Sequence, residues 1–328
     1  MNRTVPGVVV EREAGGALGK ALALPGQLFA WRKPRTREAV FAFICLSPWL
    51  THFGILIAGA MFYSLYLSFC KSDLLTGTKW VGLGNYKQLF FEDPLFPQAL
   101  KVTAIYSFGA VPLNTVLAML IALMLNQDIK LRGAWRTLYY MPSIVSGVAV
   151  SIIWAWMFNP VYGLINAALM GLGMHNPPRW IFSEEWALPA FIIMSLWGTG
   201  SNMLLYLAGL QSIPTPLYDA AKVDGANTLR RFWHVTLPML SPTVFFNLIM
   251  NVIGSFQIFT QSYIMTQGGP NNATLTMVLF LYRKAFQQFR HGYASAIAWA
   301  LFGIIMGLTL LVLRSSALWV YYEGELAK

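Results

Sequence analysis

Residues 219–238 read DAAKVDGANTLRRFWHVTLP and form a polar segment between two long apolar runs of this chain. Thr215 suits the N-cap of a helix, and Gly225 suits the left-handed residue that closes one. A short helix is therefore predicted over residues 216–224, with a second short helix over 227–235. A compact hairpin of two helices joined at a glycine is a shape that a partner protein can bind.

Composition places the chain among integral membrane proteins. Of its 328 residues, 56% are hydrophobic and 11% are charged, whereas about 25% are charged in a typical soluble domain. Crossing a hydrocarbon core of about 30 Å takes roughly 20 helical residues. The predicted fold class is all-α, a polytopic membrane bundle with six transmembrane helices. The six uncharged runs lie near residues 40–70, 102–125, 138–158, 186–211, 238–266 and 293–313.

The distribution of basic residues predicts that both termini are cytoplasmic. Of 23 Lys and Arg, 15 fall in the two tails and in the second and fourth loops, and eight fall in the other three loops. The positive-inside rule then gives a multi-pass protein of the cell (inner, cytoplasmic) membrane. The excess of Lys and Arg on the cytoplasmic side of the membrane accounts for the net charge of +10. No nucleic-acid partner is expected, because the basic residues lack a base-reading context.

The predicted domain organisation follows from these runs and tails. A basic cytoplasmic tail covers residues 1–38, a six-helix domain covers 39–318 and a cytoplasmic tail covers 319–328. The polar loop within the six-helix domain covers 212–238.

No source of energy for transport is visible in the sequence. All charged residues can be placed outside the six runs, whereas ion-coupled transporters keep titratable groups at membrane depth. His52 lies within a run, and we interpret it as hydrogen-bonded near a helix end rather than as a proton relay. Residues 15–20 only superficially resemble a phosphate-binding loop. The chain is therefore predicted to be no enzyme and to hold no cofactor or metal, so uphill transport would need another polypeptide.

The segment 219–238 resembles the cytoplasmic coupling motif of binding-protein-dependent ABC importer permeases. That motif is Glu-Ala-Ala, three residues, Gly, nine residues and Ile-x-Leu-Pro. The chain matches it at Ala220, Ala221, Gly225, Leu237 and Pro238, with Asp219 in place of Glu and Val235 in place of Ile. Other stretches are similar to the carbohydrate (maltose/glycerol-3-phosphate) branch of type I importers. They are 80–86, WVGLGNY; 207–214, LAGLQSIP; 265–270, MTQGGP; and 292–296, GYASA.

The resemblance implies a type I importer permease fold and a set of partners. These are a second, homologous permease subunit, two ATPase subunits that carry ATP and Mg²⁺, and an extracytoplasmic solute-binding protein. A short helix seated in a cleft of an ATPase can transmit rigid-body motion to the membrane helices. The alternative is an ordinary amphipathic surface loop. The residues implied in coupling are Asp219, Ala220, Ala221, Asp224, Gly225, Leu237 and Pro238.

A stripe of uncharged polar residues on the fifth run is a candidate solute pathway. Its members, at helical spacing, are Asn247, Asn251, Ser255 and Ser262. An unpaired buried amide costs about 2–7 kcal/mol, so the stripe should face a bundle interior, a partner or water. Asparagine offers both donors and acceptors to sugar hydroxyls. Helix–helix hydrogen bonding is the alternative for the amides.

Three aromatic residues, Trp154, Trp197 and Tyr206, are candidates for stacking on a sugar, with interfacial belts and packing as the alternative.

Two function classes remain open from the sequence. The first is a non-catalytic permease subunit of an ATP-driven carbohydrate importer, embedded in the lipid bilayer. The second is a self-sufficient secondary transporter or channel for a small polar solute. The lack of basic groups within the runs favours a neutral sugar over an anionic substrate.

Overall fold

The computed structural model describes residues 34–73 and 77–321. Most of the predicted N-terminal tail, and the last seven residues of the predicted C-terminal tail, lie outside the described residues. The chain divides into two compact units, Met1–Phe62 and Tyr63–Lys328.

The described part of the first unit is one apolar helical segment. It contains α2 (Pro34–His52), a π-helical turn η1 (Phe53–Gly59) and the start of α3 (Ala60–Ser68). From Glu38 to Ser68 the segment is long and apolar enough to span a membrane. Its large apolar side chains are exposed, which suits contact with lipid, since the helix satisfies its own backbone hydrogen bonds.

The second unit begins with a small hairpin that the all-α prediction did not include. Strands β1 (Cys70–Asp73) and β2 (Gly77–Trp80) pair antiparallel, with Cys70 opposite Trp80. The short helix α4 (Gly84–Lys87) follows, and its Asn85 donates hydrogen bonds of 2.8 and 2.9 Å to the carbonyls of Ser68 and Cys70.

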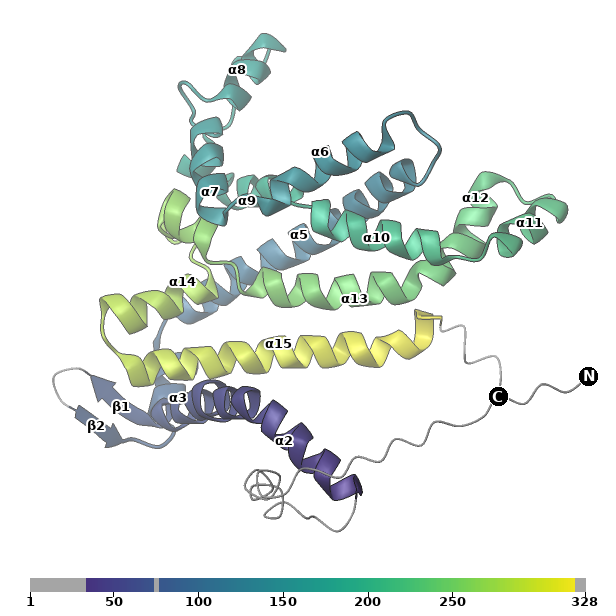
Figure 1. The fold of residues 1–328 in the computed structure, drawn as a ribbon. Coiled ribbons are helices and arrows are strands. Elements are labelled where there is room, and N and C mark those ends of the chain that lie inside the picture. Colours follow the sequence, from purple (N-terminus) through teal and green to yellow (C-terminus); the bar gives the residue numbers. More distant parts are fainter. Residues whose placement is uncertain (1–33, 74–76, 322–328) are drawn as a thin grey trace, which may run out of the picture. The chain divides into compact units, whose positions relative to one another are not determined.

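The remaining elements of the second unit form a bundle of helices (Figure 1). Helices α5, α10, α13 and α15 run alongside one another, and α6 packs on α5 and α10. The helices and helical turns after α4 are η2 (Gln88–Glu92), α5 (Leu95–Leu125), α6 (Arg132–Ile144), α7 (Gly147–Met157), α8 (Leu164–Gly171), η3 (Trp180–Phe182), α9 (Ala187–Leu196), α10 (Gly200–Ser212), α11 (Thr215–Val223), α12 (Thr228–Arg231), η4 (Phe232–Thr236), α13 (Leu237–Phe256), η5 (Ser262–Thr266), α14 (Met277–Tyr282), η6 (Arg283–Gln287) and α15 (His291–Trp319).

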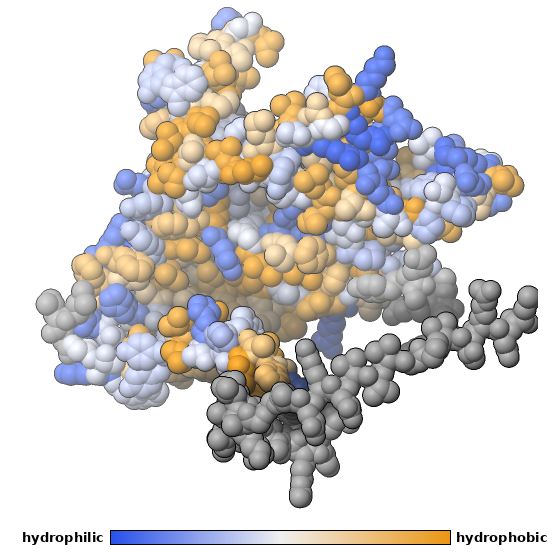
Figure 2. All heavy atoms as spheres, in the orientation of Figure 1, coloured by the Kyte–Doolittle hydropathy of each residue, from blue (hydrophilic) through white to orange (hydrophobic). Residues whose placement is uncertain are grey.

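The predicted fold class is confirmed. Within the described residues, four helices meet the length and hydropathy needed to cross a membrane, and two bent helix pairs bring the number to six. On the face drawn in Figure 2, apolar residues cover much of the bundle, and hydrophilic residues gather at the loop before α6 and around α11 and α12.

The third and fourth predicted spans are bent rather than straight. Helices α6 and α7 meet at 96° across a break at Val145 and Ser146, and α9 and α10 meet at 44°. Pro142 lies in the last turn of α6, three residues before the first break, and Gly198 and Gly200 lie at the second. Residues that disfavour a continuous helix therefore accompany both bends.

The fifth span differs from the prediction at both ends. The second helix of the polar segment, expected over 227–235, is continuous with the span, so that one helix runs from Thr228 to Phe256. The helix does not break at Pro238, because the π-helical turn η4 precedes it and the amide of Leu237 bonds the carbonyl of Phe232, five residues back. The widened turn makes room for a proline, which lacks an N–H.

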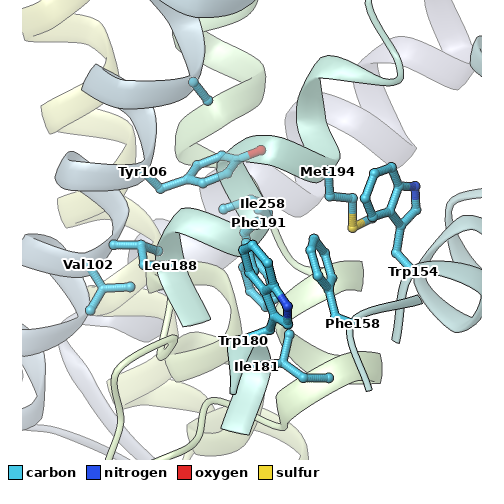
Figure 3. Packing of buried hydrophobic residues seen from close by; sticks show 12 residues of the cluster. Val102, Tyr106, Trp154, Phe158, Trp180, Ile181, Leu188, Phe191, Met194 and Ile258 are labelled. Atoms are coloured by element: carbon cyan, nitrogen blue, oxygen red, sulfur yellow. The ribbon is translucent and has the colours of Figure 1, made fainter. Parts of the chain in front are cut away.

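A large buried cluster packs α5 against α7, η3 and α9. Figure 3 shows Val102 next to Leu188, and Trp180 beside Phe158. Elsewhere, a Cβ on Gly209 would lie 2.6 Å from Oγ1 of Thr243, so α10 and α13 approach closely at a glycine.

A buried ion pair joins Asp93, in the link between η2 and α5, to Lys284 in η6, at the opposite end of the bundle from α11 and α12. Asp93 Oδ2 is 3.1 Å from Lys284 Nζ, and both side chains are about nine-tenths buried, with 8% and 10% exposed. The hydroxyl of Tyr293 donates to Asp93 Oδ2 (2.9 Å) and the amide of Leu95 donates to Oδ1 (3.0 Å). Burial raises the pKa of the Asp93 carboxyl, but these hydrogen bonds and the ammonium outweigh it, so the pKa lies below its ordinary value.

Candidate functional site

The α11–α12 hairpin, residues 215–231, projects from one end of the bundle (Figure 1). Helix α11 begins at Thr215, with Pro214 in the N-cap position, so the expectation that Thr215 caps the helix is wrong. It ends at Val223, one residue before the predicted end. The polar segment therefore folds as a helix, as its local signals indicate.

Gly225 closes α11 in the left-handed conformation, with φ of +75°. Its amide bonds the carbonyl of Lys222 (3.0 Å), and the amide of Ala226 bonds that of Ala221 (2.9 Å), which is the Schellman pattern of a helix C-terminus. No atom lies within 4 Å of a Cβ built on Gly225. The backbone conformation, and not close packing, therefore calls for glycine here.

The chain restarts as a helix at once after the glycine. The side chain of Asn227 accepts a hydrogen bond of 2.9 Å from the amide of Arg230 and so caps α12. Tyr218 on α11 and Thr236 in η4 share a hydroxyl–hydroxyl hydrogen bond of 3.1 Å. This bond ties α11 to the base of the long helix that contains α13.

The surface of the hairpin is exposed and partly apolar. No residue of α11 is buried. Asp219, Ala220 and Asp224 are exposed and Ala221 is half-buried, while Asp219 pairs with Lys222 at 2.9 Å. Leu237 and Pro238 are half-buried at the start of α13. The sequence pattern did not single out three exposed apolar side chains that share this surface, namely Leu217, Val223 and Leu229.

A polar cavity of about 400 Å³ lies between α5, α9, α10 and α13, beside the segment that follows α13. None of its lining residues is charged. The polar residues that line it are Tyr106, Asn114, Ser195, Asn202, Asn251, Ser255, Gln257, Thr260 and Gln261. Two of the chain breaks, between α9 and α10 and after α13, lie at its wall, and broken helices often line binding sites in transporters.

Three asparagines from three helices set the hydrogen bonding of the cavity. Asn202 on α10 donates to Oδ1 of Asn251 on α13 (2.9 Å). Asn114 on α5 donates to Oγ of Ser195 on α9 (2.9 Å). Within the described residues, Nδ2 of Asn251 is buried and has no hydrogen-bond partner. Because an unpaired buried amide is costly, this donor can serve water or a bound solute.

The candidate pathway residues separate into two groups. Asn251 and Ser255 line the cavity. Asn247 is buried one turn earlier on α13, where its Nδ2 donates to the carbonyl of Thr243 (3.0 Å). Tyr206 is fully buried in the packing of α10, and Trp197 lies on an apolar groove beside α6. Ser262, in η5, donates to the carbonyl of Thr274.

Sequence reasoning missed Asn114, Ser195 and Asn202. They lie in three different apolar segments, and only the packing of the helices brings them together. As for metals, no group of three His, Cys, Asp or Glu that could hold an ion occurs within residues 34–73 and 77–321.

Comparison with known proteins covers most of the chain. The family described as "Binding-protein-dependent transport system inner membrane component" matches residues 114–322. The probable ABC transporter permease protein YesP of Bacillus subtilis is 43% identical over 301 residues, covering 90% of this chain and 97% of that protein. The lactose transport system permease protein LacF of Rhizobium radiobacter is 37% identical, covering 78% and 88%.

Among solved structures, a bacterial alginate ABC transporter in complex with an alginate pentasaccharide-bound periplasmic protein contains a chain with the same fold. Its TM-score is 0.75 at 23% identity, covering 85% of this chain and 95% of that one. The fold, the family match and the similarity over nearly the full length of YesP agree. The chain therefore belongs to the family of binding-protein-dependent transport system inner membrane components, as a membrane-embedded permease subunit of an importer.

Proposed function

We propose that this permease carries a neutral carbohydrate through the polar cavity between α5, α9, α10 and α13. The single observation on which the proposal rests is the uncharged lining with an unpartnered amide donor on Asn251. Sugar hydroxyls both donate and accept, and asparagine side chains match them without a fixed charge. Asn251 and Ser255, with Asn202 on the facing helix, are the proposed solute contacts.

The printed names of the relatives favour a carbohydrate. LacF is a lactose transport permease, and a 33% identical protein of Thermococcus litoralis is a trehalose/maltose transport permease. A charged solute would favour charged side chains along its path, and the cavity lining has none.

In the proposed assembly, the α11–α12 hairpin docks an ATPase. Its exposed Asp219, Ala220 and Asp224 would face the partner, with Val223 supplying apolar contact area. ATP and Mg²⁺ would be held by two ATPase subunits, and a second permease and an extracytoplasmic solute-binding protein would complete the importer. Both termini and the hairpin would then be cytoplasmic, and Asp93 would lie on the outer side.

Transport by the complete importer in liposomes tests the cavity. Asn251→Ala should abolish uptake while the subunits still assemble, because the free donor and the acceptor for Asn202 are both lost. Asn247→Ala is the matched control, since Asn247 lies one turn away on the same helix and does not line the cavity. Equal uptake by both variants would contradict the proposed pathway.

ATPase association tests the hairpin separately. Ala220→Asp places a charge on the exposed face of α11 and should release the ATPase. Asn126→Asp adds the same charge at an exposed position of another loop at that end of the bundle and should leave association unchanged. Uptake by this chain alone would refute the dependence on partners.

A further inference from the structure

Gly254 lies inside α13, two residues before the end of the helix, and its surroundings do not call for a glycine. Its backbone φ is not left-handed, unlike that of Gly225. A Cβ built on Gly254 meets no atom within 4 Å, whereas a Cβ on Gly209 would collide with α13. Glycine is, after proline, the least favourable residue inside a helix. Neither backbone conformation nor packing within the described chain therefore explains this glycine.

The open space beside Gly254 belongs to the polar cavity. Gly254 is exposed and lines this cavity. Residues three and four positions apart are neighbours on the surface of a helix, and the neighbours of Gly254 at these spacings, Met250, Asn251 and Gln257, line the cavity as well. Gly254 is thus central in the face of α13 that borders the cavity. A side chain at this position would take up cavity volume.

Close contact with a helix of another subunit is the competing reason for a glycine at this position. Membrane helices that approach each other closely carry small residues four positions apart. The residues four positions before and after Gly254 are Met250 and Ile258, which are both large, and Met250 exposes 53% of its surface. These side chains would keep a second helix away from the backbone at Gly254, which favours a solute as the occupant of the space.

We propose, building on the function proposed above, that Gly254 determines the size of the carbohydrate that the cavity accepts. One ring of the solute lies against the open backbone at Gly254, beside Asn251. The buried Nδ2 donor of Asn251, which has no partner within the described residues, then gains a hydroxyl acceptor. A mismatch of one methylene between a ligand and the wall of its pocket costs about tenfold or more. A side chain at position 254 therefore selects against a solute of ring size.

The test asks whether a reagent of ring size reaches this space in the complete importer. Two methanethiosulfonates, one carrying a methyl group and one a glucosyl group, react with single thiols in a Cys45→Ser background, since Cys45 is exposed and Cys70 is buried. Mass spectrometry of this chain gives the rates. Both reagents should label Gly254→Cys.

Gly303→Cys is the matched control for labelling. Gly303 on α15 is equally exposed and equally open, but it does not line the cavity. A thiol in apolar surroundings stays protonated and unreactive. The glucosyl reagent should therefore leave Gly303→Cys unlabelled.

A second series measures the size limit with Asn251→Cys as the reporter thiol. Adding Gly254→Leu should lower the rate of the glucosyl reagent about tenfold or more and leave the rate of the methyl reagent nearly unchanged. Gly303→Leu should change neither rate. Gly254→Ala should lower the glucosyl rate by less, while the Tm stays the same or rises, because alanine favours a helix over glycine. A slower glucosyl reaction without a lower Tm excludes misfolding as the cause, even if Gly254→Leu does not assemble.

The outcomes separate this proposal from the proposed function. If both reagents label Asn251→Cys but neither labels Gly254→Cys, a helix of the second permease covers Gly254, and the size-determining role is refuted while the cavity stands. A Gly254→Leu variant that slows both reagents equally, or neither, would also refute that role. If neither reagent reaches Asn251→Cys, the cavity is closed to solutes, and the proposed function is refuted as well.

Discussion

The buried pair of Asp93 and Lys284 should make a large and specific contribution to stability. The charges are 3.1 Å apart and both side chains are about nine-tenths buried. Removing one partner of such a pair leaves an unpaired charge in a poorly solvated site, at a cost of about 3–5 kcal/mol. Asp93→Asn keeps the size and the acceptor oxygen of the side chain and removes only the charge.

The thermal midpoint of the purified importer measures this cost. For a domain of somewhat smaller size, each kcal/mol shifts Tm by about 2–4 °C, so Asp93→Asn should lower the Tm by roughly 6–20 °C. Lys284→Met should do the same. The double variant should recover at least half of the loss, because neither charge is then buried alone.

The exposed pair of Asp128 and Arg132 is the matched control. Asp128 is fully exposed, and ion pairs in water contribute little, so Asp128→Asn should leave the Tm unchanged. A Tm within 1 °C of wild type for Asp93→Asn, or a double variant that is less stable than either single variant, would refute the reasoning.

Three further predictions concern acid and two glycines. Because the folded pKa of Asp93 is lowered, its contribution to stability is fully present above the ordinary carboxyl pKa near 4 and is lost as pH falls through the folded value. The Tm difference between wild type and Asp93→Asn should shrink in acid. Gly225→Ala should cost about 1–2 kcal/mol and speed amide exchange in α11, whereas Gly225→Asn should cost less. Gly292→Ala should prevent folding because its Cβ would overlap the Cys70 carbonyl, while Gly303→Ala, in open space on the same helix, should fold normally.

Local signals explain why the hairpin could be predicted so closely. Gly225 is recognisable in the sequence as a helix stop, and it does adopt the left-handed conformation. The first helix ends within one residue of its expected end. The error at Pro238 has a different origin. A proline ordinarily ends or kinks a helix, and no local sequence signal indicates that a π-helical turn will precede it.

Only one wall of the polar cavity, the one formed by α13, could be predicted from the sequence. Asn251 and Ser255 recur at helical spacing on one element, so their shared face is visible in the sequence. Asn202 and Asn114 come from two other helices, and their meeting depends on close helix contacts such as that at Gly209. Hydropathy carries no information on helix angles, so the 96° and 44° bends at Ser146 and Gly198 could not be read from it either.

The continuity of the long helix connects the two proposed sites. From Leu229 beside the hairpin to Asn251 in the cavity is 22 residues, about 33 Å of one helix. The Tyr218–Thr236 hydrogen bond fixes α11 to the base of that helix. A force applied to the hairpin would therefore displace Asn251 together with the rest of this helix, as one rigid body. The helix ends at Phe256, next to Gln257 in the cavity wall, so the displacement would be absorbed there, where the cavity can change shape.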